Sequence, residues 1–186
     1  MGQKVVVIEP DEAVLAGRRK WRFTGAERPS FADPCGPGEE SVWDYPRPPR
    51  IERMRAVVEV FAGDVCIAKS KEAMRVCETA GAPTWYLPPH DVDESFVSYD
   101  GSQSVCEWKG IAQGFSVAGT RNAGWRYTHM FAEFAELYLW CGFYPGKLRC
   151  LVDGVPVQPQ PGGYYGGWVT PGLTGPIKGG PGSSGW

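Results

Sequence analysis

The stretch with the richest chemistry is residues 103–117, which we predict to form two strands with a polar and aromatic corner between them. On an extended strand, Cys106 and Trp108 face one way, and Glu107 and Lys109 face the other. A carboxylate and an ammonium that project together into a pocket can do acid–base work when burial tunes their pKa values. Glu107 would then be the general acid or base, and Lys109 its partner or an oxyanion stabiliser. The alternative is a solvated ion pair beside a buried Trp108 side chain.

Five further residues could complete such a pocket as ligand-binding groups, and four of them also have a structural interpretation. They are Glu78, Tyr86, Asp91, Trp125 and Tyr127. Glu78 could instead be a helix cap or a surface charge, and Asp91 a turn residue. Trp125 and Tyr127 stand two apart and share one face if their segment is extended, a pattern more typical of a core than of a ligand cage.

The common catalytic and cofactor motifs are absent from the sequence. No Walker-type phosphate loop, GxSxG or HExxH occurs, and the glycine clusters do not stand between a strand and a helix. The six cysteines form no CxxC pair, and the chain has two histidines. We therefore expect free thiols, no metal site and no bound cofactor, which leaves cofactor-independent acid–base chemistry open.

Composition favours a single domain built mainly from short strands. The 186 residues include 25 glycines and 17 prolines, which disfavour long helices, while 42% hydrophobic residues allow a real core. A net charge of -2 argues against a nucleic-acid partner or an anionic membrane surface. No apolar run is long enough to cross a membrane, and the first ten residues lack a signal-peptide pattern, so we predict a cytoplasmic protein.

Local patterns predict the elements that must position these residues. β-Hairpins are indicated at residues 55–69 and 148–157, the second with an Asp-Gly turn, and a strand is indicated at 84–87. Asp100-Gly101 suggests a turn into the central stretch. Residues 130–138 carry apolar side chains at helical spacing and predict one short amphipathic helix.

The composition of the two ends of the chain predicts that they form arms around a core. We divide the chain into an N-terminal arm packed on the body (1–50), a core (51–157) and a Gly/Pro-rich C-terminal arm (158–186). Free linkers need no aromatic residues, and both arms contain several, so we expect both to be ordered against the body. Trp43 and Tyr45 should anchor the proline-rich segment 41–50. The alternative is that this segment is an exposed peptide recognised by another domain.

An ordered series of motifs in the sequence resembles a known family. The series runs Glu78-Thr79, Tyr86, Pro88-Pro89, Asp91-Val92, Cys106-Glu107-Trp108-Lys109-Gly110, Trp125, Tyr127, Phe143-Tyr144 and Val152-Asp153-Gly154. The segment 40–49 precedes it, and Gly166-Gly167-Trp168-Val169-Thr170 and a glycine-rich end follow it. Over residues 39–186 the chain thus resembles the family called domain of unknown function 427.

The resemblance implies a β-tent (Mss4-like) fold, in which antiparallel sheets meet at an angle, as in methionine sulfoxide reductase B and the thalidomide-binding domain of cereblon. Relatives of that fold often hold zinc on CxxC pairs, which this chain lacks. Some bind a small ligand in an aromatic cage. The family has also carried a nucleotidyltransferase-like label, but no Gly-Ser with a following Asp-x-Asp is present to hold magnesium. Gly114 stands where many members have an aromatic residue, which implies an altered pocket.

Together these patterns predict a mainly β, antiparallel β-tent domain with one short amphipathic helix and extended arms. The expected function is binding of a small molecule in an aromatic-lined acid/base pocket, as in an enzyme of specialised metabolism. The alternative is a non-catalytic protein-interaction module that uses its two arms for partner contacts. The expected partner is a small-molecule ligand rather than nucleic acid or membrane, and a homodimer is a further expectation.

Overall fold

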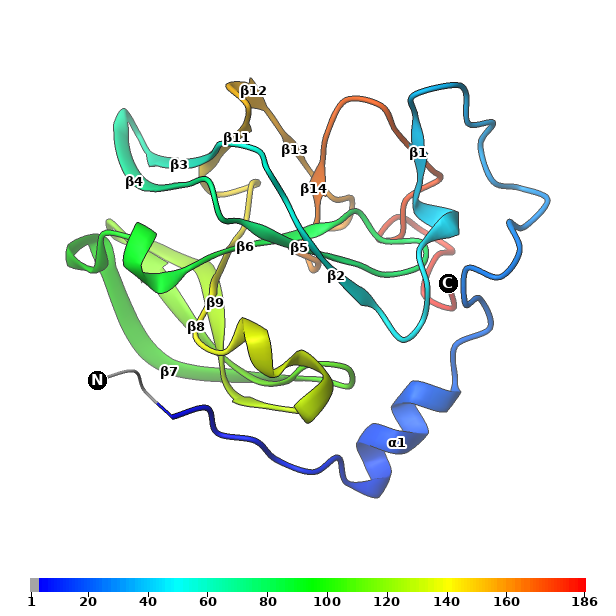
Figure 1. Cartoon of the computed structure of the whole chain (residues 1–186), viewed down its shortest axis with the longest axis horizontal. Coiled ribbons are helices and arrows are strands. Elements are labelled where there is room, and N and C mark those ends of the chain that lie inside the picture. The colour runs from blue at the N-terminus through cyan, green and yellow to red at the C-terminus, as the bar shows by residue number, and fades with distance from the viewer. Residues whose placement is uncertain (1–3) are drawn as a thin grey trace.

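The protein is mainly β and antiparallel, with two open sheets (Figure 1), in a computed structural model that describes residues 4–186. The larger sheet has seven strands in the spatial order β2 (Arg50–Arg53), β5 (Met74–Cys77), β6 (Thr84–Leu87), β10 (Cys141–Phe143), β9 (Thr120–Met130), β8 (Gly110–Val117) and β7 (Val97–Cys106). The smaller sheet has the order β12 (Val155–Pro156), β11 (Arg149–Val152), β3 (Val58–Ala62) and β4 (Val65–Ser70). The smaller sheet lies over one face of the larger one, which is consistent with a β-tent-like domain (Figure 1).

The two hairpins predicted from local patterns are present in the smaller sheet. β3 pairs antiparallel with β4, and β11 pairs antiparallel with β12 across Asp153-Gly154. Both residues of that turn have positive φ, at 50° and 77°, which is why Asp-Gly is preferred there. The Asp153 carboxylate also accepts a hydrogen bond from the Val57 backbone N–H at 2.8 Å, which ties the turn to the start of β3.

Strand alternation divides the core into two clusters on opposite faces of the larger sheet. On β6, Trp85 and Leu87 pack with Val58 and Val60 of the smaller sheet, whereas Tyr86 belongs to a separate cluster on the other face. The side-chain period of two in a strand requires this split. The second face carries the aromatic residues that the sequence singled out, and it is the face on which the candidate site forms.

Within residues 4–186, both arms contact the body. Two short pairings lie within them: β1 (Glu40–Ser41) runs parallel to β15 (Leu173–Thr174), and β13 (Gln158–Pro159) pairs antiparallel with β14 (Trp168–Val169). Trp43 and Tyr45 are buried, and the Trp43 ring packs edge-on against Phe23 and Trp186 at 5.3 Å each. The two arms therefore share one aromatic cluster.

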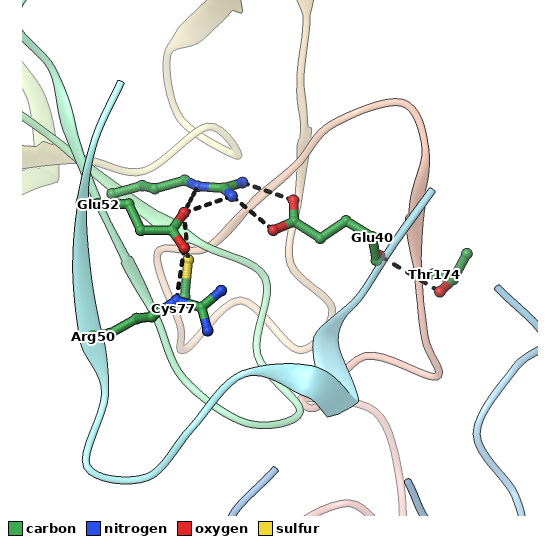
Figure 2. A network of polar contacts seen from close by, with 6 residues as sticks. Glu40, Arg50, Glu52, Cys77 and Thr174 are labelled. Carbon is green, nitrogen blue, oxygen red and sulfur yellow. Dashed lines mark hydrogen bonds and ion pairs between the residues drawn. The ribbon is translucent and has the colours of Figure 1, made fainter. Parts of the chain in front are cut away.

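An ion-pair network fastens the N-terminal arm to the edge of the larger sheet. Arg75 on β5 donates to both carboxylate oxygens of Glu40 at 2.8 and 2.6 Å and to Glu52 on β2 at 2.7 Å. Figure 2 shows Glu52 also facing Arg50 and the Cys77 thiol, and Glu40 beside Thr174. The two carboxylates thus join β1, β2 and β5, and the main-chain oxygen of Glu40 accepts a hydrogen bond from the Thr174 hydroxyl of β15 at 3.5 Å.

The helices are few and short. One α-helix, α1 (Glu12–Arg19), is found in residues 4–186, and Asp11 caps it by accepting a hydrogen bond from the Val14 N–H at 2.9 Å. The 3₁₀ helices are η1 (Val42–Asp44), η2 (Pro89–Asp91), η3 (Glu94–Phe96) and η4 (Ala132–Leu137). Throughout this part of the chain, every helix is too short or too polar to cross a membrane.

Two local predictions were wrong in detail. Residues 130–138 form a strand end and then η4 rather than one α-helix, since Phe134 and Leu137 are buried three residues apart, the spacing at which 3₁₀ side chains align. Asp100-Gly101 is not a turn between two strands. It lies inside β7, where the pairing with β8 shifts register between Tyr99 and Gln103, so the turn residues form an irregularity that the long strand absorbs.

Candidate ligand-binding site

A cavity of ≈ 630 Å³ opens on the face of the larger sheet that the smaller sheet leaves uncovered. Its aromatic wall comes from Tyr86 on β6, Trp125 and Tyr127 on β9, and Tyr144 just after β10. The Trp125 indole N–H donates to the Tyr86 hydroxyl at 3.4 Å, and its ring lies 4.6 Å from that of Tyr144. Burial raises the pKa of both Tyr86 and Tyr127, so both remain hydroxyl donors at neutral pH.

Lys109 lines this cavity and is buried. It belongs to the turn at residues 107–109 between β7 and β8, and 7% of it is exposed. Gly110 follows with φ +121°, and a side chain there would clash with the His129 carbonyl, so the turn requires glycine. The sequence predicted that Glu107 and Lys109 lie on a strand and face the same side of it. Residues 107–109 instead form a turn, so this prediction was wrong.

The electrostatic surroundings keep Lys109 charged. Burial alone would lower its pKa, but the Cys106 thiol, the Tyr86 hydroxyl and the Glu78 carboxylate outweigh burial and raise the pKa above its ordinary value. Its ammonium also lies 5.9 Å from the centre of the Tyr127 ring. A buried group that stays cationic can stabilise negative charge on a ligand, but it is a poor general base.

Glu107 is held by the N-terminal arm rather than by Lys109. Its carboxylate accepts a hydrogen bond from the Trp21 indole N–H at 2.9 Å, and its main-chain oxygen accepts one from Arg18 Nε of α1 at 2.7 Å. Both Glu107 and Trp21 line the cavity. The arm therefore contributes one wall of the site and orients the carboxylate that the sequence singled out.

Arg47 and Glu78 form an ion pair in the lining of the same cavity, with the Arg47 guanidinium carbon 4.3 Å from the centre of the Trp21 ring. Arg47 Nε donates to the Glu78 carboxylate at 2.8 Å, and the Arg47 side chain is 2% exposed. The remaining Arg47 nitrogens donate to the main-chain oxygens of Phe23, Thr79 and Trp186. One guanidinium thus joins the N-terminal arm, the loop after β5 and the C-terminal arm.

The C-terminal arm closes the cavity with Tyr165, Gly166 and Lys178. A side chain at Gly166 would clash with the Trp125 ring, so the arm's backbone lies directly against that indole. Gln160 fixes the arm by accepting a hydrogen bond from the Ala82 N–H at 3.0 Å and donating to the Lys178 main-chain oxygen at 2.9 Å. Burial, assisted by the charge of Arg47, lowers the pKa of Lys178 to about 8.

The cavity is cationic although the whole chain is weakly acidic. Among residues 4–186, its lining contains five basic side chains and two carboxylates, a difference of three positive charges, against a net charge of -2 for the chain. The basic residues are Lys20, Arg47, Lys109, Lys147 and Lys178, and the acidic ones are Glu78 and Glu107. This imbalance and the aromatic wall suit an organic anion with a flat apolar body.

The structure brings six of the seven predicted site residues together around this cavity: Glu78, Tyr86, Glu107, Lys109, Trp125 and Tyr127. Asp91 does not join them. It belongs to η2 and lines a separate shallow hollow beside β4 with His90, because the prolines before it turn the chain away from the aromatic face. Gly114 does line the main cavity, where a side chain would meet the Ser102 hydroxyl at 2.5 Å.

Sequence reasoning missed the site residues that the arms supply, namely Trp21, Arg47, Tyr165 and Lys178. The one available indication was that both arms carry aromatic and basic residues among their glycines and prolines. In the described part of the chain, His, Cys, Asp and Glu side chains do not gather in groups of three that could hold a metal ion.

The fold and cavity define a mainly β, antiparallel domain with one aromatic and cationic pocket. A family described as a domain of unknown function (DUF427) matches residues 50–154, more than half of the chain, and the protein belongs to that family. A comparison with curated proteins finds no match. The matched region contains the aromatic wall and Lys109, whereas Trp21, Arg47 and Lys178 lie outside it.

Proposed function

We propose that this protein binds a small organic anion with an aromatic or otherwise flat body, and that the pocket is an acid/base site. The observation that carries this proposal is Lys109, a buried cation in the lining of an aromatic cavity, for which no ion-pair partner is found among residues 4–186. A buried charge is costly to keep without a partner. A ligand carboxylate or enolate oxygen would supply that partner, with Tyr86 and Tyr127 as further hydrogen-bond donors.

Glu107 is the group best placed to exchange a proton with such a ligand. The Trp21 indole holds its carboxylate at the cavity wall, while Lys109 would stabilise negative charge that develops on the ligand. Once a turnover assay is found, Glu107→Gln should lower kcat by about 10²-fold or more while leaving the melting temperature nearly unchanged. The amide oxygen of glutamine can still accept from Trp21, so a large loss of stability with activity retained would overturn this role.

Binding can be tested without knowing the natural ligand. Benzoate and other aromatic carboxylates should raise the melting temperature and bind measurably by calorimetry, since a ligand that binds only the folded state stabilises it. Lys109→Met should weaken binding of benzoate by about tenfold or more, because a charge-assisted contact is lost. Lys71→Met, which removes an exposed lysine outside the cavity, is the matched control and should leave affinity unchanged. Equal affinity for benzoate and neutral benzamide would contradict the proposal.

The burial of Trp43 and Tyr45 favours this function over an interaction module built on the arms. Both anchoring aromatics of the proline-rich segment pack into the body, and Arg47 from the same segment is committed to the cavity wall. The side chains that a partner domain would read are thus already used inside the fold.

A further inference from the structure

Lys178 and Arg47 share the same two neighbours. The Lys178 ammonium lies 3.6 Å from the centre of the Trp21 ring, and the Arg47 guanidinium carbon lies 4.3 Å from the same ring. Both side chains also donate to the Trp186 main-chain oxygen, Lys178 at 2.9 Å and Arg47 at 3.1 Å. Two cations therefore share one indole ring and one acceptor.

The repulsion between these two cations is relieved at Lys178 rather than at Arg47. A guanidinium does not release its proton in proteins, whereas an amine does so readily when buried near another cation. The nearby carboxylates are already engaged, Glu78 by Arg47 and Glu107 by Trp21. With a pKa of about 8, roughly a tenth of Lys178 is the neutral amine at pH 7, about 300-fold more than for an unperturbed lysine.

We propose that Lys178 is a nucleophile that captures the carbonyl group of an anionic aldehyde or ketone in this cavity as an imine. This inference rests on the proposed function, and it names the substrate class of the same site. Lys178 is 5% exposed, but it lines the cavity and is therefore open to a small ligand and closed to large reagents. A lysine desolvated beside a second cation is a known arrangement for imine chemistry.

The chemical steps balance without an oxidant or reductant. The Lys178 nitrogen attacks the carbonyl carbon, the C=O π electrons move to oxygen, and proton transfer from nitrogen to oxygen gives a neutral carbinolamine. A proton delivered to its hydroxyl group lets one water leave, which forms the C=N bond. Overall, one amine and one carbonyl give one imine and one water. Glu107 lines the same cavity and is the acid that can deliver and recover that proton.

Two of the four lysines in the cavity lining, Lys109 and Lys178, have different tasks in this scheme. Lys109, whose surroundings raise its pKa, stays an ammonium and holds the anionic group of the ligand. Lys178, at the arm side of the cavity, supplies the lone pair. The aromatic wall of the same cavity would hold the flat body of the ligand.

Trapping with 4-carboxybenzaldehyde and cyanoborohydride tests the proposal, with intact mass and peptide mapping as the readout. The expected result is one reduced adduct on Lys178, formed at a rate that rises with pH through a midpoint near 8, where the amine becomes neutral. Lys178→Arg keeps the charge and a donor toward Trp186, and it should abolish the adduct in a folded protein. Lys109→Met should slow capture of the anionic aldehyde about tenfold or more, but not that of neutral benzaldehyde.

Labelling spread evenly over surface lysines such as Lys71, or undiminished adduct formation in Lys178→Arg, would overturn the proposal. Calorimetry with benzoate, which has no reactive carbonyl, separates this outcome from failure of the proposed function. Binding of benzoate without any imine on Lys178 would support the proposed anion-binding function and refute the proposal that Lys178 is a nucleophile. Absence of both would refute both proposals.

Discussion

Replacing Arg47 with methionine should separate the two arms from the body of the protein. The guanidinium donates to Glu78 at 2.8 Å and to the main-chain oxygens of Phe23, Thr79 and Trp186 at 2.9, 3.0 and 3.1 Å. Methionine fills a similar volume but makes none of these bonds. Two main-chain acceptors and one carboxylate would therefore lose their partner at once, while the Trp186 oxygen would keep the hydrogen bond from Lys178.

The expected loss of stability is about 3 kcal/mol. Removing one partner of a buried ion pair costs about 3–5 kcal/mol, because an uncompensated charge stays behind. The low end applies here, since the Glu78 side chain is 28% exposed and water can partly replace the guanidinium. Arg53→Met is a matched control, because Arg53 and its partner Glu136 have side chains 71% and 44% exposed. Such an exposed pair contributes about 0–1 kcal/mol.

Urea denaturation, followed by tryptophan fluorescence and circular dichroism, measures both losses. Limited proteolysis adds a local readout, because freed arms should be cleaved near their glycines and prolines before the core is. If Arg47→Met and Arg53→Met lowered the free energy of unfolding equally, within about 0.5 kcal/mol, the Arg47 contacts would not hold the arms as proposed. The same conclusion would follow if the arms of Arg47→Met resisted proteolysis as well as the wild type.

Two further predictions test the cavity wall and the thiols. Gly166→Ala places a methyl group against the Trp125 ring. It should lower the free energy of unfolding by about 1–3 kcal/mol and change the tryptophan emission. Gly180→Ala is the control and should be neutral, because its methyl group would meet no atom of the described chain within 4 Å. Equal effects of the two changes would contradict the packing of the arm on Trp125. Iodoacetamide at pH 8 should modify the exposed Cys66 first. Burial raises the pKa values of the other three thiols in this comparison to about 12, so they should react only when the protein unfolds. These three are Cys77, Cys141 and Cys150. Peptide mapping after a time course checks this order, and early labelling of the buried set in folded protein would contradict it.

Local patterns in the sequence were enough to predict much of the fold. The two hairpins and the strand β6 depend on residues within a few positions of one another, such as the Asp153-Gly154 turn, so local sequence indicates them. Trp43 and Tyr45 likewise indicated an anchored arm, because large aromatics are costly to leave in water. The same local logic failed at Asp100-Gly101, where pairing with β8 overrides the turn preference.

The sequence indicated some residues of the candidate site and missed others. Which residues it indicated depends on the part of the chain that supplies them. Tyr86, Trp125, Tyr127 and Lys109 come from the strands and turn of one sheet, so identifying the strands placed them near each other. Asp91 was placed wrongly, because a short loop and η2 can leave a strand in several directions and only packing selects one.

By itself, the sequence determined the class of fold, the segments that become strands, and the residue types available for acid–base and anion chemistry. Only the tertiary structure decided that Trp21, Arg47 and Lys178, from the two arms, complete a cavity begun by the strands. The physical reason is that these contacts join residues far apart in the chain, so no local spacing records them. Their charges act on one another only after the fold has excluded water, and this is how an ordinary lysine at position 178 becomes a candidate nucleophile.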